Sequence, residues 1–292
     1  MFVLLGGPGV AIHVDRDAYP TARWGVERAA ARGIAAIPFV HHDADALLRQ
    51  VRAAAGRKRR PIVVTDGFCP GCGPAPLRTY LDVVRRYGGR LVIDDTQALG
   101  VLGDHPGPDA PFGRGGGGSL RRQALAGPEL VVAASLAKAF GAPVAALAGD
   151  AAVVGRFESK AETRVHCSPP SAASVHAAAR ALTLNAQIGD ARRARLAALV
   201  RRFRGGATAA DFPPQGGLFP VQTLKGVSDP VALHERLRRL GVHTVLHDGE
   251  GRRPRISFVL TALHEPAEVD AAVAALARAA VAAPPVALAT AR

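Results

Sequence analysis

The sequence predicts an α/β fold: a mostly parallel sheet covered by helices, followed by a smaller C-terminal α+β domain. Short β-branched runs alternate with amphipathic helical patterns through the first half of the chain. After Pro169 and Pro170 the pattern changes to long helices rich in Ala and Arg. The 292 residues, of which 48% are hydrophobic, can bury one large core or two modest ones.

Six short apolar segments are expected to form the strands of the first domain. They are residues 10–14, 34–40, 61–65, 90–94, 130–134 and 144–148. The segment before the first strand is broken by Gly and Pro and is interpreted as a loop. Asp43 is a candidate cap for one intervening helix, and Pro76 opens another that Gly88 ends. The Gly-rich stretch 113–118 is interpreted as a flexible loop.

The second half is expected to begin with one or two long helices that run to about Phe203 and stop at Gly205 and Gly206. Further strands are expected at 217–222, 242–246 and 255–260, with helices at 230–240 and 266–280. The sequence therefore predicts a large domain over 1–175 and a linking helix with a small domain over 176–292.

Composition and charge restrict the possible functions. The net charge of +13 is dispersed over helix faces, without an aromatic platform or a nucleic-acid motif, which disfavours nucleic acid as a partner. No apolar run approaches the ~20 residues of a membrane span. Three cysteines cannot form a disulfide framework, so a reducing cytoplasm is the simplest compartment. A redox role for Cys69 and Cys72 lacks a thioredoxin-like context.

Polar residues follow two neighbouring predicted strands. The strand 90–94 ends at Asp94 and continues into Asp-Thr-Gln, while the strand 130–134 continues into Ser-Leu-Ala-Lys, which ends at Lys138. Ligands of open parallel sheets bind at the carboxyl ends of the strands. A carboxylate and a lysine close to the core are costly without a purpose, although a structural ion pair is the alternative explanation.

Two motifs in this region resemble a known family. RLVIDDTQALGVLG at 90–103 and SLAKAFG at 135–141 are similar to the α-oxoamine synthase group of fold-type-I pyridoxal-phosphate (PLP) enzymes, within aminotransferase class I/II. That group includes 8-amino-7-oxononanoate synthase and glycine C-acetyltransferase. VTDGFC at 64–69 and RISF at 255–258 extend the resemblance over nearly the whole chain. The resemblance implies a fold-type-I transferase, PLP as cofactor and a cytoplasmic homodimer.

The resemblance also implies roles for individual residues. Lys138 would form the Schiff base with PLP, and Asp94 would bind the pyridinium nitrogen so that the ring acts as an electron sink. Ser135 would contact the phosphate, and Arg255 would hold the substrate carboxylate. Two positions depart from the family pattern. Gln97 replaces a histidine near the phenolic oxygen of the cofactor, and Cys69 replaces a serine that contacts it.

The implied reaction condenses an amino acid with an acyl thioester, carried by coenzyme A or an acyl carrier protein, to an α-amino ketone. Because Gln97 departs from the family pattern, an aminotransferase reaction or other aldimine chemistry is the alternative. The family's Gly-containing phosphate turn and its stacking aromatic residue are expected upstream of Met1. A catalytically silent chain that pairs with a full-length homologue is therefore a further alternative. No metal is expected, because His41 and His42 precede a helix cap without a third ligand nearby and are interpreted as a surface loop.

Overall fold

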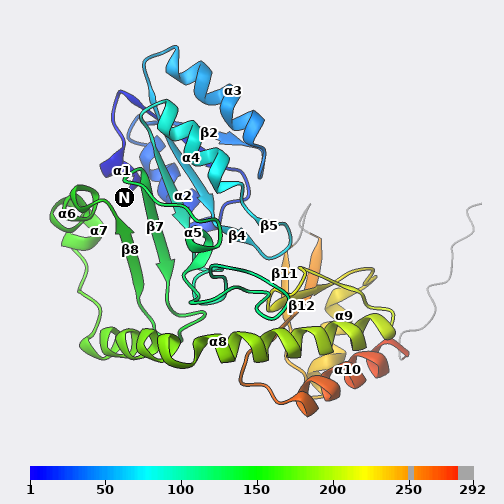
Figure 1. Cartoon of the computed structure of the whole chain (residues 1–292). Helices are drawn as coiled ribbons and strands as arrows, with labels where there is room; N and C mark the ends of the chain where they lie inside the picture. Colours follow the sequence, from blue (N-terminus) through cyan, green and yellow to red (C-terminus); the bar gives the residue numbers. More distant parts are fainter. Residues whose placement is uncertain (249–252, 282–292) are drawn as a thin grey trace, which may run out of the picture. The chain divides into compact units, whose positions relative to one another are not determined.

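The computed structural model describes residues 1–248 and 253–281, which divide into two compact units (Figure 1). The first unit comprises Met1–Cys69 and Gly73–Asp190, and the second comprises Pro70–Cys72 and the described residues from Ala191 onward. The helix α8 (Ala172–Ala209) contributes to both. The expected boundary after residue 175 falls near the start of this helix, and the assignment of separate roles to the two parts stays a prediction.

The first unit is built on a six-stranded sheet in the order β2-β1-β3-β6-β7-β8. Its strands are β1 (Val10–Asp15), β2 (Ala35–Phe39), β3 (Arg60–Asp66), β6 (Arg90–Asp94), β7 (Leu130–Ser135) and β8 (Ala145–Gly149). All neighbours are parallel except β7 and β8. The predicted strands and the mostly parallel sheet are confirmed. The strand order reverses between β1 and β3, and such a switch point is where open α/β sheets bind ligands.

Helices cover both faces of this sheet. They are α1 (Phe2–Leu5), α2 (Pro20–Ala30), α3 (Ala44–Ala55), α4 (Leu77–Arg86), α5 (Gly118–Arg122), α6 (Ala151–Lys160) and α7 (Glu162–Val165). The helix α3 begins as predicted, because Oδ1 of Asp43 accepts a hydrogen bond from the Ala46 N–H at 2.8 Å. The prediction of a loop at the N-terminus was wrong, since α1 buries Phe2 in the core beside Val26.

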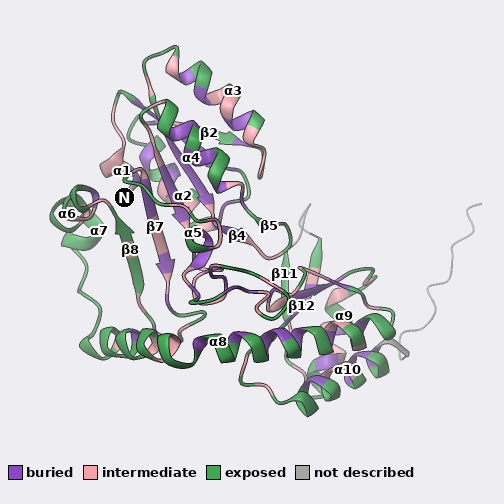
Figure 2. Cartoon of the chain, viewed as in Figure 1, coloured by how far each residue is buried: buried purple, intermediate pink, exposed green. Residues whose placement is uncertain are grey.

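The strand side chains alternate between two apolar cores. Ile62 and Val64 pack with α1, α2 and α6, whereas Val63 packs with α3 and α4 on the other face. The central strands are consequently buried, while β8 is largely exposed at the edge of the sheet (Figure 2). A sheet buried on both faces leaves only its carboxyl and amino edges for ligands.

The Gly-rich stretch 113–118 is folded, so the prediction of a flexible loop was wrong. Gly117 pairs with Leu99 and Arg114 pairs with Asp104 in isolated β-bridges. The Gly100 N–H donates to the carbonyl of Gly116 at 2.7 Å, and Gly118 begins α5. Backbone hydrogen bonds to the loop after β6 thus order a segment whose composition indicates flexibility.

The second unit contains an antiparallel sheet in the order β11-β12-β10-β9 and two helices besides α8. These elements are β9 (Pro214–Gln215), β10 (Val221–Leu224), α9 (Pro230–Arg239), β11 (Val245–Asp248), β12 (Pro254–Val259) and α10 (Pro266–Val281). The strand expected at 217–222 begins only at Val221, because Gly216 and Gly217 have positive φ angles and form a turn. The strand expected at 242–246 is likewise shifted, to β11.

The long helix does not stop at Gly205 and Gly206 but continues to Ala209, which corrects the sequence prediction. A Cβ at position 206 would lie 2.8 Å from a methyl carbon of Val273 in α10. A Cβ at position 205 would meet no atom within 4 Å. Gly206 therefore lets α10 approach α8, a tertiary requirement that outweighs the poor helix propensity of glycine.

Alanine substitutions at these two glycines are expected to have opposite effects on the free energy of unfolding. Gly205→Ala should stabilise the chain by about 0.5–1 kcal/mol, because alanine is the better helix former and meets no neighbour. Gly206→Ala should destabilise it by about 1–3 kcal/mol through overpacking against Val273. Urea unfolding of the two variants beside the parent chain measures both values, and equal shifts would contradict the close packing.

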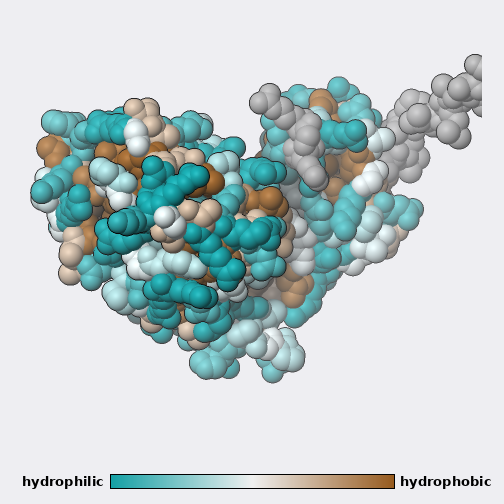
Figure 3. Space-filling model, turned by 90° about the horizontal axis from the view of Figure 1, so that it is seen from above, coloured by the Kyte–Doolittle hydropathy of each residue, from teal (hydrophilic) through white to brown (hydrophobic). Residues whose placement is uncertain are grey.

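The surface is mixed in character. The face of the molecule in Figure 3 is mainly hydrophilic, with apolar patches between polar side chains. Within residues 1–248 and 253–281, no helix combines the length and the apolar character that a membrane crossing requires.

Candidate functional site

Four strands of the parallel sheet place polar side chains along one edge. Asp15 ends β1, Asp66 ends β3, Asp94 ends β6 and Ser135 ends β7. In the strand register Asp66 lies opposite Asp94, and Asp94 lies opposite Ala133. Parallel strands share the direction of their carboxyl ends, so these residues meet at the edge where ligands bind.

The loops after β6 and β7 are joined by hydrogen bonds. Oδ1 of Asp94 accepts from the Thr96 N–H at 3.0 Å, and Oγ1 of Thr96 accepts from the Ser135 N–H at 2.9 Å. Oγ of Ser135 in turn accepts from the Ala137 N–H at 3.3 Å. Hydrogen bonds through Thr96 thereby connect the loop that holds Asp94 with the loop that holds Ser135.

Lys138 lies in the loop after β7, beside the loop after β6. A Cβ on Gly100, whose φ is +83°, would stand 2.5 Å from Cβ of Ala139, so the two loops are in close contact. The side chain of Lys138 is exposed, and its Nζ lies 5.4 Å from the centroid of the Tyr19 ring. An accessible amine at an aromatic face is consistent with a cation–π contact.

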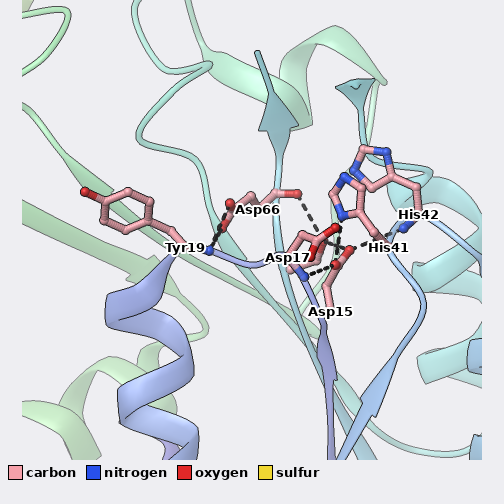
Figure 4. A network of polar contacts seen from close by, with 7 residues as sticks. Asp15, Asp17, Tyr19, His41, His42 and Asp66 are labelled. Carbon is pink, nitrogen blue, oxygen red and sulfur yellow. Dashed lines mark hydrogen bonds and ion pairs between the residues drawn. The ribbon is translucent and has the colours of Figure 1, made fainter. Parts of the chain in front are cut away.

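Tyr19 is the residue of this site that sequence reasoning missed. It follows β1 and precedes α2, and its N–H donates to Oδ1 and Oδ2 of Asp66 at 3.2 and 3.1 Å (Figure 4). Its ring is half-exposed. An aromatic residue before a helix-opening proline, just after the first strand, was a signal in the sequence. Its importance becomes visible only with the pairing of β1 and β3.

Burial raises the pKa of Asp66 to about 6, and the nearby carboxylates of Asp94 and Asp15 add to the rise. The hydrogen bond from Tyr19 acts in the opposite direction. Burial also raises the pKa of Asp95 to about 6, although Oδ2 of Asp95 accepts from the Ser119 N–H at 2.9 Å. Two carboxyl groups at the carboxyl edge, Asp66 and Asp95, therefore have raised pKa values and ionise less readily than exposed ones.

Asp95→Asn is expected to remove a pH dependence of stability. The pKa of Asp95 in the folded chain is about 6, above the ordinary 3.8, so folding favours its protonated form. That contribution is fully present below pH 3.8 and is lost as the pH rises through 6. Urea unfolding at about pH 4 and about pH 8 should show the parent chain losing roughly 2–2.5 kcal/mol relative to Asp95→Asn. Parallel pH profiles of the two chains would contradict the shift.

The remaining predicted residues have different positions. Gln97 lies in the half-buried turn after Asp94, and Cys69 ends the short strand β4 (Phe68–Cys69), which pairs with β5 (Gly73–Pro74). Arg255 lies on β12 of the second unit, opposite His247 in β11. The structure thus brings Asp94, Gln97, Ser135 and Lys138 together on the loops of the first unit, whereas Arg255 belongs to the second unit.

The sequence is similar to a known family and to curated relatives within it. The family model described as aminotransferase class I and II matches residues 1–276. The 8-amino-7-oxononanoate synthase of Alkalilimnicola ehrlichii is 31% identical over 252 residues, covering 82% of this chain and 59% of the relative. That of Marinobacter nauticus is 31% identical over 258 residues, with the same coverage. The chain thus spans about three fifths of the length of these relatives.

Solved structures show the same fold. Serine palmitoyltransferase from S. paucimobilis with bound PLP–myriocin aldimine superimposes with a TM-score of 0.78 at 18% identity, covering 96% of this chain and 69% of that chain. The 8-amino-7-oxononanoate synthase from Francisella tularensis has a TM-score of 0.72 at 15% identity, covering 96% and 78% respectively. These similarities identify the fold as fold type I, as the sequence predicted.

Proposed function

The chain belongs to the aminotransferase class I and II family, and from that premise we propose that it is a PLP-dependent transferase of the α-oxoamine synthase type. The observation that carries the proposal is the placement of Asp94 and Lys138 on interlocked loops at the carboxyl edge of adjacent parallel strands. Relatives named 8-amino-7-oxononanoate synthase support it. The substrates we propose are an amino acid and an acyl thioester.

The residues at this edge fit PLP in their chemistry. Bound PLP supplies an aldehyde for an amine and a protonated ring that withdraws electrons from the α-carbon of an amino acid. Lys138 offers an exposed amine, Asp94 a carboxylate for the ring nitrogen, and Ser135 a hydroxyl for the phosphate. Gln97 and Cys69 are proposed as further cofactor contacts. The exposed face of Tyr19 beside Nζ of Lys138 is suited to stack on a planar ring.

The chain's own groups also organise the site before any ligand binds. The Thr96 N–H holds the carboxylate of Asp94, and Asp66 holds the backbone of Tyr19. Such preorganised contacts lower the reorganisation cost of binding and reaction. Arg255 is proposed to bind the substrate carboxylate, because a planar guanidinium suits a bidentate contact with a planar anion. Pairing of two copies in the cytoplasm is part of the same proposal.

One observation favours a second candidate within the same family. Gln97 stands at the end of the Asp94 turn, where an amide forms hydrogen bonds but cannot carry the charge of an imidazolium. A reaction without the acyl-transfer step, such as transamination, places fewer demands on a charged group there. Production of a keto acid from an amino acid in the absence of acyl thioester would support this candidate.

The test uses the purified full chain and added PLP. Borohydride reduction followed by peptide mass analysis should locate a covalent PLP adduct on Lys138. Release of free thiol from an acyl thioester, dependent on an added amino acid, should then report the condensation. Adduct without thiol release across a panel of acyl donors would overturn the acyltransferase proposal. Absence of any adduct in a folded chain would overturn the cofactor proposal.

A further inference from the structure

Asp15, His41 and His42 form a second cluster of side chains, at the carboxyl end of β1, and the proposed function uses none of these three. Oδ1 of Asp15, a residue only 1% exposed, is 2.8 Å from Nδ1 of His41. Oδ2 of Asp15 accepts from the backbone N–H of His42 at 3.4 Å (Figure 4). His41 and His42 lie in a loop, as predicted, but they are half-buried around a buried carboxylate rather than at the surface.

The two imidazoles are arranged in an unusual way. Their rings are stacked with centroids 3.8 Å apart and planes 24° apart. His42 adopts a φ of +57°, a left-handed conformation that is uncommon outside glycine, although histidine adopts it more often than most residues do. The turn between β2 and α3 thus stacks the rings of His41 and His42 on each other.

Both rings retain a buried nitrogen without a partner. The Nε2 atoms of His41 and His42 are buried, and neither has a hydrogen-bond partner within the described part of the chain. An unpaired buried polar atom costs about 1–3 kcal/mol, so two adjacent ones require an explanation. Since a carboxylate accepts the proton of Nδ1 in His41, Nε2 of that ring is left with a free lone pair.

We propose that His41 and His42 bind a divalent transition metal ion of the Zn²⁺ type through their Nε2 atoms, while Asp15 orients the His41 ring through Nδ1. Cys69, which is also proposed above as a cofactor contact, is the further ligand. One nitrogen from each histidine and one oxygen of Asp15 lie within 4.8 Å of one another. Sγ of Cys69 lies within 4.8 Å of a ring nitrogen of His41. Tetrahedral zinc with bonds of about 2.0–2.3 Å separates its ligand atoms by about 3.3–3.8 Å, so binding requires the side chains to move closer together.

The charge and position of the cluster agree with a cation site. Histidine nitrogen and cysteine sulfur are preferred zinc ligands, and the Asp15 carboxylate supplies negative charge. The cluster lies at the carboxyl ends of β2 and β1, next to the switch point, and Oγ1 of Thr65 in β3 donates to Oδ2 of Asp15 at 3.4 Å. A metal there would fix the β2–α3 turn against the end of β1.

The test measures Zn²⁺ binding to the full chain, without a histidine tag, in competition with a chromophoric chelator. The parent chain should bind one equivalent, and His42→Asn should weaken binding at least tenfold, because asparagine tolerates the left-handed φ but removes the imidazole. His105→Asn is the matched control, since His105 is exposed and also has a positive φ of 45°. Equal affinities of His42→Asn and the parent chain would overturn the proposal.

Two further measurements keep the proposal testable if His42→Asn fails to fold. Zn²⁺ should protect His41 and His42 of the parent chain, but not His105, from diethyl pyrocarbonate, as mapped by mass spectrometry. Modification of His41 and His42 at an unchanged rate would overturn the site. Co²⁺ should produce a thiolate charge-transfer band that Cys69→Ser abolishes. Retention of that band in Cys69→Ser would remove Cys69 from the ligand set.

Discussion

Replacement of Lys138 by alanine is expected to abolish the covalent attachment of PLP to the chain completely. Lys138 supplies the exposed amine at the carboxyl edge of β7, beside the Tyr19 ring. Alanine removes the nucleophile without disturbing a buried contact, because the side chain is solvent-exposed. Absorption spectra of PLP-treated protein, together with the mass of the borohydride-reduced chain, measure the loss.

The matched control is Lys160→Ala. Lys160 is also exposed and lies in the last turn of α6 rather than at the strand edge. This variant should retain the adduct in full, which separates a specific site from random modification of surface lysines. Equal adduct formation by Lys138→Ala and the parent chain would show that the strand-edge lysine is not the attachment residue.

Asp94→Asn is expected to leave the fold intact and to slow chemistry at the α-carbon of a bound amino acid by roughly 10²–10³-fold. The amide oxygen of asparagine can still accept the hydrogen bond from the Thr96 N–H that holds Asp94. It carries no negative charge, however, and therefore no longer favours a protonated ring nitrogen. Exchange of the α-proton of amino acids into deuterated water, followed by NMR, measures the rate.

Asp82→Asn provides the comparison for this substitution, because Asp82 is exposed on α4 and away from the strand ends. It should exchange the α-proton at the rate of the parent chain. If Asp94→Asn also exchanged at that rate, Asp94 would have no part in activating the amino acid, and the carboxylate would be structural.

Much of the first unit could be predicted from local patterns. Its strands are short apolar runs, and the cap at Asp43 follows from one side chain and one backbone N–H three residues later. Asp94 and Lys138 could be selected because they end or follow buried parallel strands, at whose carboxyl ends ligands bind. Their placement on touching loops agrees with that selection. The expected burial of Lys138 was wrong, since its side chain is exposed.

Other features depended on contacts between distant segments. The Gly-rich stretch 113–118 has the composition of a flexible loop, but hydrogen bonds to the turn after Asp94 order it. The helix α8 passes through Gly206 because α10 packs against it there. Local propensity carries no information about either partner, so it predicted a loop and a helix end.

The order of residues along the chain was thus sufficient to determine the class of fold and to select the strand-end residues, because apolar periodicity locates the strands and their carboxyl ends. Only the tertiary structure decided which strand ends are neighbours. The strand order β1-β3-β6-β7 brings Tyr19 to Lys138, and the pairing of β1 with β2 brings His41 to Asp15. Those contacts join residues that are far apart in the sequence. They depend on the order of the strands in space, which local sequence patterns do not give.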